Sequence, residues 1–190
     1  MVAMTCAFPR AGTADGVADD DLWRYRASGA AIDAGIVAAL PVALGTGLAT
    51  GVGAGITLGH GWTWGARASW ARASEPSIGW TVIHDDVRAG VSGGGQISAG
   101  RGSLGVRLAV GTAVVHETRL RMRGDLAGSR GKALEDARTA WFPTAALDAV
   151  LGLHISGAWM MVLTGGPSLT RMDGGFRRGW MSQVGVAWQL

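Results

Sequence analysis

The last twelve residues, Gly179 to Leu190, read Gly-Trp-Met-Ser-Gln-Val-Gly-Val-Ala-Trp-Gln-Leu. Large apolar side chains occupy the even positions of this stretch, whereas most odd positions carry small or polar side chains. A period of two places these two sets on opposite faces of an extended strand. We therefore expect a β-strand with one apolar face and a tryptophan near each end of that face, at Trp180 and Trp188.

The polar face of this strand indicates the kind of sheet. Gly and Gln opposite a tryptophan-bounded apolar face are unusual in a soluble core, but a closed membrane barrel needs lipid outside, a polar interior and aromatic rings at both interfaces. Trp180 and Trp188 lie eight residues apart, which is about 26 Å along a strand and about 20 Å along the membrane normal at a 40° tilt. The stretch resembles the C-terminal strand of a bacterial outer-membrane β-barrel, with Leu190 where that family usually ends in an aromatic residue.

Length and composition fit one domain. The chain has 190 residues, 32 of them glycine, one cysteine and a net charge of +3. A single cysteine excludes an internal disulfide, and so small a charge excess does not indicate nucleic-acid binding. We expect a flexible N-terminal lead-in over residues 1–21 and a barrel domain over residues 22–190. The lead-in contains no apolar run of signal-peptide length, so we expect a signal sequence upstream of Met1; a chain that is not exported is the alternative.

Residues 34–59 carry no charge, which raises the possibility of a transmembrane helix. Pro41 and several glycines oppose a helix, since each glycine in a helix interior costs about 1 kcal/mol. Large apolar residues also fall almost wholly on even positions. The pattern favours two strands joined near residues 41–47, with a helix as the alternative.

The same alternation continues past Gly59-His60-Gly61, where a three-residue turn would pair Leu58 with Trp62 and face both outward. The next strand changes phase at residues 84–86, which predicts a β-bulge. Residues 104–114 alternate most cleanly.

Residues 121–138 show no strand pattern and are expected to form a solvated external loop, with a helical turn over residues 132–137. The basic side chains of this loop are Arg121, Arg123, Arg130, Lys132 and Arg138. A strand on odd positions then begins near Trp141, and a tight turn at residues 156–158 leads to another strand. Residues 165–175 are expected to form a loop before the last strand.

The count is eight strands with alternating short and longer connections, which is the topology of an all-β, antiparallel, up-and-down transmembrane β-barrel. This topology assigns all nine tryptophans to two membrane-interface belts. The periplasmic belt holds Trp23, Trp62, Trp64, Trp159 and Trp188, and the outer belt holds Trp70, Trp80, Trp141 and Trp180. In a soluble sandwich these rings would cluster in one core.

Polar and charged side chains of the opposite parity face the lumen. Eight strands leave an interior that side chains fill, and buried charges there need partners, so we expect a network of ion pairs and not a conducting or catalytic site. The expected lumen residues are Asp33, Asp86, Glu117, Asp148, Arg67, Arg88, Arg107, Arg119, His154 and Gln183.

The whole pattern resembles the small outer-membrane barrels of the OmpA transmembrane-domain and OmpX type. The resemblance implies a non-enzymatic envelope role in the bacterial outer membrane, contacts with lipid, lipopolysaccharide and the barrel-assembly machinery, and no cofactor, metal or nucleic acid; we expect a monomer. The second hypothesis is a soluble β-barrel that binds a small apolar ligand, favoured by the inward parity of Phe142 and Met160. An outer-membrane hydrolase with a rim site at residues 84–86 is a third hypothesis.

Overall fold

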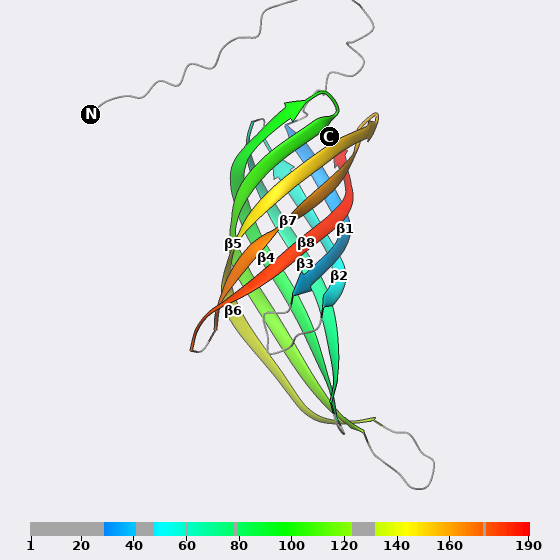
Figure 1. Ribbon diagram of the computed structural model, residues 1–190, viewed down its shortest axis with the longest axis vertical. Helices are drawn as coiled ribbons and strands as arrows, with labels where there is room; N and C mark the ends of the chain where they lie inside the picture. The colour runs from blue at the N-terminus through cyan, green and yellow to red at the C-terminus, as the bar shows by residue number, and fades with distance from the viewer. Residues whose placement is uncertain (1–28, 41–47, 60, 78–79, 123–131, 173) are drawn as a thin grey trace, which may run out of the picture.

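The protein, in a computed structural model, forms a closed barrel of eight strands (Figure 1). The structure describes residues 29–40, 48–59, 61–77, 80–122, 132–172 and 174–190. No helix able to cross a membrane occurs among these described residues. The strands are β1 (Ala30–Leu40), β2 (Ala49–Leu58), β3 (Trp62–Ser77), β4 (Trp80–Ala99), β5 (Gly102–Met122), β6 (Lys132–Ser156), β7 (Trp159–Met172) and β8 (Gly175–Gln189).

Each strand pairs antiparallel with the next, and β8 pairs with β1 to close the ring. Residues 34–59, for which a helix was the alternative, belong mostly to β1 and β2, so the strand prediction is confirmed. The closing seam brings Gly35 opposite Gly185. A Cβ atom on Gly35 would lie 2.3 Å from the backbone oxygen of Val184, so this close approach requires a residue without a side chain.

The predicted alternation between the two faces of the wall is confirmed. Large apolar side chains point out of the barrel and remain exposed, as at Ile36, Val52, Leu108, Leu147 and Val184. Polar and charged side chains of the opposite parity point inward and are buried. The period of two therefore places the polar side chains inside and the apolar side chains outside, the reverse of a soluble protein.

The turns at one end of the barrel are short, and glycines with positive φ occupy them, namely Gly59, Gly61, Gly100 and Gly157. At the β2–β3 connection the predicted pairing is wrong by two residues. Leu58 lies opposite Trp64, not Trp62, because Trp62 and Thr63 at the start of β3 pair only with β4. Leu58, Trp62 and Trp64 are all exposed on the outer face, as expected.

At the other end, β3 to β6 extend well beyond β1, β2, β7 and β8 (Figure 1). Several predictions fail here. Residues 132–137 belong to β6 and not to a helical turn, residues 121–122 belong to β5, and β7 continues to Met172 through most of the expected loop. The β4 ladders to β3 and β5 run without a register shift, so no bulge occurs at residues 84–86. A shift occurs instead between Arg119 and Leu120 of β5.

The errors on β4, β5 and β6 share one physical cause. Where β3 to β6 extend beyond the other strands, both faces of the sheet carry polar residues. The apolar alternation that identifies a strand in a sequence is therefore lost in this extension. Main-chain hydrogen bonds to neighbouring strands maintain the extended conformation there, and these bonds depend on tertiary pairing.

Candidate functional site: the lumen and the barrel ends

The lumen contains a connected set of polar side chains near the short-turn end. On β1, the carboxylate of Asp33 accepts a hydrogen bond of 3.1 Å from the side-chain amide of Gln183 on β8. The guanidinium of Arg67 on β3 lies 3.7 Å from the same carboxylate and donates to the hydroxyl of Thr164 on β7 at 3.0 Å. Four strands are thereby linked across the interior.

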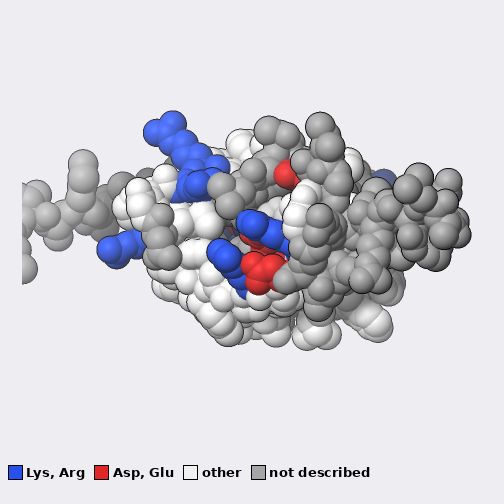
Figure 2. All heavy atoms as spheres, turned by 90° about the horizontal axis from the view of Figure 1, so that it is seen from below, with Lys and Arg blue, Asp and Glu red and all other residues white. Residues whose placement is uncertain are grey.

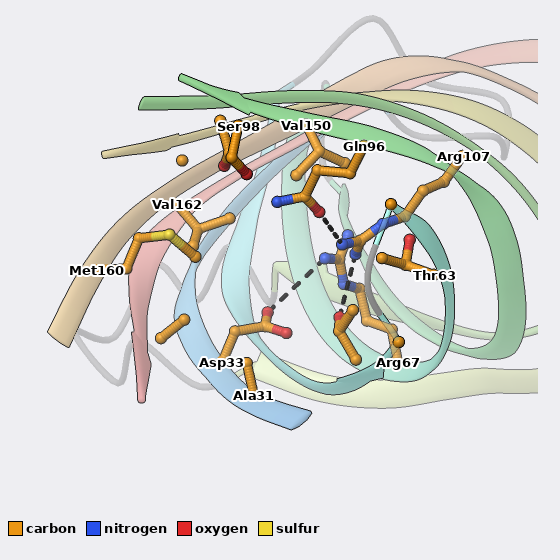
Figure 3. Close-up of a pocket in the computed structure, with 16 residues that line it drawn as sticks. Ala31, Asp33, Thr63, Arg67, Gln96, Ser98, Arg107, Val150, Met160 and Val162 are labelled. Carbon is orange, nitrogen blue, oxygen red and sulfur yellow. Dashed lines mark hydrogen bonds and ion pairs between the residues drawn. The ribbon is translucent and has the colours of Figure 1, made fainter. Parts of the chain in front are cut away.

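Arg107 on β5 approaches Arg67 from another part of the wall, and their guanidinium groups lie near one another in the lumen (Figure 3). Arg107 donates to the hydroxyl of Thr57 at 3.1 Å and to the side-chain oxygen of Gln96 at 3.2 Å. Its ladder partner on β6 is Asp148, which is buried. Each of these arginines is thus close to a carboxylate of the barrel wall, so the two positive charges have local counter-charges.

Two cavities adjoin these arginines. The first, of about 60 Å³, opens toward the short turns and is lined by Asp33, Gln96 and Ser103 as well as both arginines. The second, of about 70 Å³, lies between Arg67, Arg107 and Arg88. Each has room for on the order of five water molecules. The buried hydroxyl of Ser103 has no protein hydrogen-bond partner, which fits a position beside water.

A second ion pair lies inside the lumen, farther from the short turns, between two residues of β4. Arg88 on β4 holds the carboxylate of Asp86 through its Nε and Nη2 atoms at 3.0 and 2.7 Å. Arg88 also donates to Ser168 on β7, at 3.5 Å. Asp86 and Arg88 are only 7% and 8% exposed, so their mutual pairing is what makes burial of both charges tolerable.

His84 is a lumen residue that the sequence interpretation missed. The bulge expected at residues 84–86 would place His84 at the rim, but the uninterrupted ladder places it on the inner face, opposite Glu117 and 4% exposed. Among the described residues, its Nδ1 atom has no hydrogen-bond partner, and neither do Asp86 Oδ1 and Thr170 Oγ1. The inward parity of the even positions from 86 to 96, extended by two residues to position 84, would have identified it.

The remaining expected lumen residues lie near the ends. Glu117 and Arg119 pair at 2.6 Å in the exposed extension of β5. The Nε2 atom of His154 lies 2.7 Å from the carbonyl oxygen of Gly157 at the β6–β7 turn, away from the charged network. Short inward hydroxyl residues on β3 and β7 also line the interior, and composition alone did not single them out: Thr63, Ser69, Thr164, Ser168 and Thr170.

Tryptophans occur on the outer surface toward both ends. Trp62 and Trp64 are in edge-to-face contact, with ring centroids 6.3 Å apart. Trp159 and Trp188 pair across β7 and β8 with ring centroids 5.2 Å apart. The rings that face outward nearer the extended end are Trp70, Trp141 and Trp180.

One tryptophan of the described residues departs from this arrangement. Trp80 shares the inward parity of His84 and Asp86 and is half-buried in the extension. Trp23 lies outside the described residues.

The charged side chains beyond Trp70 form local pairs. Arg72 donates to both carboxylate oxygens of Asp85 at 2.8 and 2.9 Å, and the indole Nε1 of Trp70 donates to the same carboxylate at 3.0 Å. The hydrogen bonds from Arg72 are the main cause of the lowered pKa of Asp85. Arg138, expected in the external loop, lies on β6 and pairs with Asp136 at 3.0 Å.

The other residues of that expected loop divide into two groups. Arg121 and Lys132 belong to β5 and β6, whereas Arg123 and Arg130 lie outside the described residues. In the described part of the chain, no group of three His, Cys, Asp or Glu residues is arranged to hold a metal ion.

No protein-family model matches the chain, and no curated protein matches it in sequence. Among solved structures, it is similar to the attachment invasion locus protein Ail of Yersinia pestis, with a TM-score of 0.54, 11% identity, and 84% of this chain and 97% of Ail covered. It is also similar to Neisserial surface protein A, with a TM-score of 0.55, 11% identity, and 86% and 98% covered.

The fold is that of the small eight-stranded outer-membrane β-barrels. The resemblance to barrels of the OmpA and OmpX type is therefore confirmed. At 11% identity the likeness extends to the fold alone.

Proposed function

We propose that the chain is a non-enzymatic protein of the bacterial outer membrane with a lumen filled by side chains, and that it acts structurally or through its exposed surface. The observation that carries this proposal is the reversed distribution of polarity. Leucine, valine, isoleucine and tryptophan cover the outer wall, while Asp33, Asp86, Arg88, Arg107 and Asp148 are buried. Soluble monomers rarely expose apolar patches of more than a few hundred Å², whereas lipid would cover such a wall.

The interior supports a structural role for the lumen. Among the described residues, six buried or half-buried charged side chains lie between the barrel ends: Asp33, Asp86, Asp148, Arg67, Arg88 and Arg107. Three are carboxylates and three are guanidinium groups, so their formal charges sum to zero. An interior of this kind stabilises a narrow barrel when its charges are paired. It does not favour the soluble alternative, because a small apolar ligand would have to displace paired charges to enter.

The partners follow from this placement. Lipid would contact the apolar wall, and the assembly machinery would bind the C-terminal strand β8. The basic side chains within residues 121–138 would bind lipopolysaccharide phosphate or an outside partner. We propose that the protein is a monomer.

The test combines two measurements on protein refolded in detergent. Boiled and unboiled samples are compared on a denaturing gel, since a closed barrel that resists the detergent migrates differently until it is heated. Tryptophan fluorescence is then measured in vesicles whose lipids carry bromine at different depths. We expect a heat-dependent mobility shift and strongest quenching at two interfacial depths. A water-soluble protein whose tryptophan emission is independent of brominated lipid would overturn the proposal.

A further inference from the structure

The hairpin of β7 and β8 carries three arginines at the end of the barrel opposite the short turns. Arg171 lies near the end of β7, and Arg177 and Arg178 lie near the start of β8. All three are exposed, and within the described residues none forms an ion pair or a side-chain hydrogen bond. Asp173 stands between them in the sequence, outside the described residues, so the hairpin keeps an excess of two positive charges.

The register assigns these arginines to particular faces. Arg178 lies opposite Leu169, and Arg171 lies opposite Phe176; all four have the outward parity of Trp180. Phe176 is 73% exposed. Arg177 lies opposite Thr170 and has the inward parity. Basic side chains project from the left edge of Figure 2, on the side where β7 and β8 end in Figure 1.

Their height relative to Trp180 indicates what they meet. Arg178 is two residues from Trp180, and Arg171 is level with Phe176, four residues from it. Two and four residues correspond to about 5 and 10 Å along the membrane normal for a strand tilted by 40°. Interfacial tryptophans lie at the headgroup level, so Arg178 and Arg171 lie at and just above the height of lipid phosphates, beside an exposed aromatic ring.

The molecule contains an internal comparison on β3. Arg72 also faces outward and lies two residues beyond an outward tryptophan, Trp70. However, Arg72 is bound in bidentate fashion by Asp85 and lies 5.5 Å from the Trp70 ring centroid. Its charge is therefore already neutralised, whereas Arg171 and Arg178 have no counter-charge among the described residues.

We infer that Arg171 and Arg178 form a lateral binding surface for a phosphorylated lipid of the outer leaflet. This inference rests on the proposed function, because it requires the apolar wall to lie in a membrane. A guanidinium group can bind a phosphate through two parallel hydrogen bonds, and Arg171 and Arg178 both have the outward parity that faces the lipid. A lipid beside the barrel wall accounts for both the positive charge and the outward direction of these side chains, whereas a soluble anion accounts only for the charge.

The experiment measures binding of bisphosphorylated lipid A to protein refolded in neutral detergent, by native mass spectrometry. The R171Q/R178Q variant should bind about 30-fold more weakly, because each arginine near an anionic surface contributes about fivefold. The matched control R72Q should change binding less than twofold. The R171K/R178K variant keeps both charges and should retain most of the affinity. All variants are first tested for heat-dependent mobility.

The possible results separate the two proposals. A wild-type protein that lacks heat-dependent mobility contradicts the membrane proposal itself. A heat-modifiable protein that binds lipid A no better than its dephosphorylated form, or whose R72Q variant loses as much affinity as R171Q/R178Q, overturns the lipid surface alone. Equal competition by inorganic phosphate or a sulfated oligosaccharide at the same concentration would show a site for soluble anions and would also overturn it.

Discussion

An arginine placed halfway along the apolar face of β8 tests whether this face lies in lipid. Val184 is four residues from Trp180 and four from Trp188, and it is 54% exposed between the outward side chains of Ile36 and Leu163. Four residues correspond to about 10 Å along the membrane normal at a 40° tilt, so Val184 would lie close to the bilayer midplane. An arginine at the midplane of a barrel wall costs about 2–4 kcal/mol.

The expected result for Val184→Arg is therefore a folding equilibrium constant lowered roughly 30-fold to 700-fold. The measurement is reversible denaturant unfolding in lipid vesicles, followed by tryptophan fluorescence. Phe176→Arg is the matched control: the position has the same parity on the same strand but lies about 10 Å beyond Trp180, where the cost should stay below about 1 kcal/mol. Equal and small effects at both positions would refute the reasoning, since surface substitutions in water usually change stability by less than about 0.5 kcal/mol.

Three further predictions concern the interior, the seam and the exposed ion pair. Asp86→Ala leaves the buried guanidinium of Arg88 without its carboxylate and should lower the free energy of unfolding by about 3–5 kcal/mol, measured with denaturant. The double change D86L/R88M should lower it less, because no uncompensated charge remains. Equal losses in the two variants would contradict the pairing argument. Gly35→Ala places a Cβ atom against backbone and should slow or abolish the appearance of the heat-modifiable form in refolding time courses. The folded-state pKa of Asp85 is lowered, chiefly by Arg72. The stability that this pair contributes is therefore present above the pKa of about 3.9 of an unfolded aspartate and is lost as pH falls below that value. Arg72→Gln should flatten this acid-side decline of the unfolding free energy, and an unchanged pH profile would argue against the pairing.

The sequence predicted the part of the barrel between the tryptophans and failed beyond it. On β1, β2, β5 and β8 the two faces differ so strongly in polarity that parity alone identifies which side chains point inward, as at Asp33 and Arg107. In the extension this contrast disappears. Asp136 and Arg138 share the inward parity of their strand, yet both are at least partly exposed, so the same alternation there no longer separates a buried face from an exposed one.

The charged site was predictable as a set of residues but not as a set of pairs. Parity places Arg67, Asp33 and Gln183 inside, but their contact depends on the relative stagger of β3, β1 and β8, which a sequence does not specify. His84 shows how one wrong register changes an assignment. A supposed bulge moved it to the rim, while the continuous ladder places it inside.

Net charge describes the exposed end of this barrel poorly, because the arrangement of its charges determines what it can bind. Three arginines of the described part of the chain, on β3, β5 and β6, are held by a nearby carboxylate, in the pairs Arg72–Asp85, Arg119–Glu117 and Arg138–Asp136. Such exposed pairs contribute little to stability, typically about 0–1 kcal/mol, but they remove free positive charge from most of the circumference. The arginines of the β7–β8 hairpin, unpaired within the described residues, then provide the positive field that an anionic partner meets. A sum over the chain of only +3 is therefore compatible with a directional basic surface on one side of the barrel.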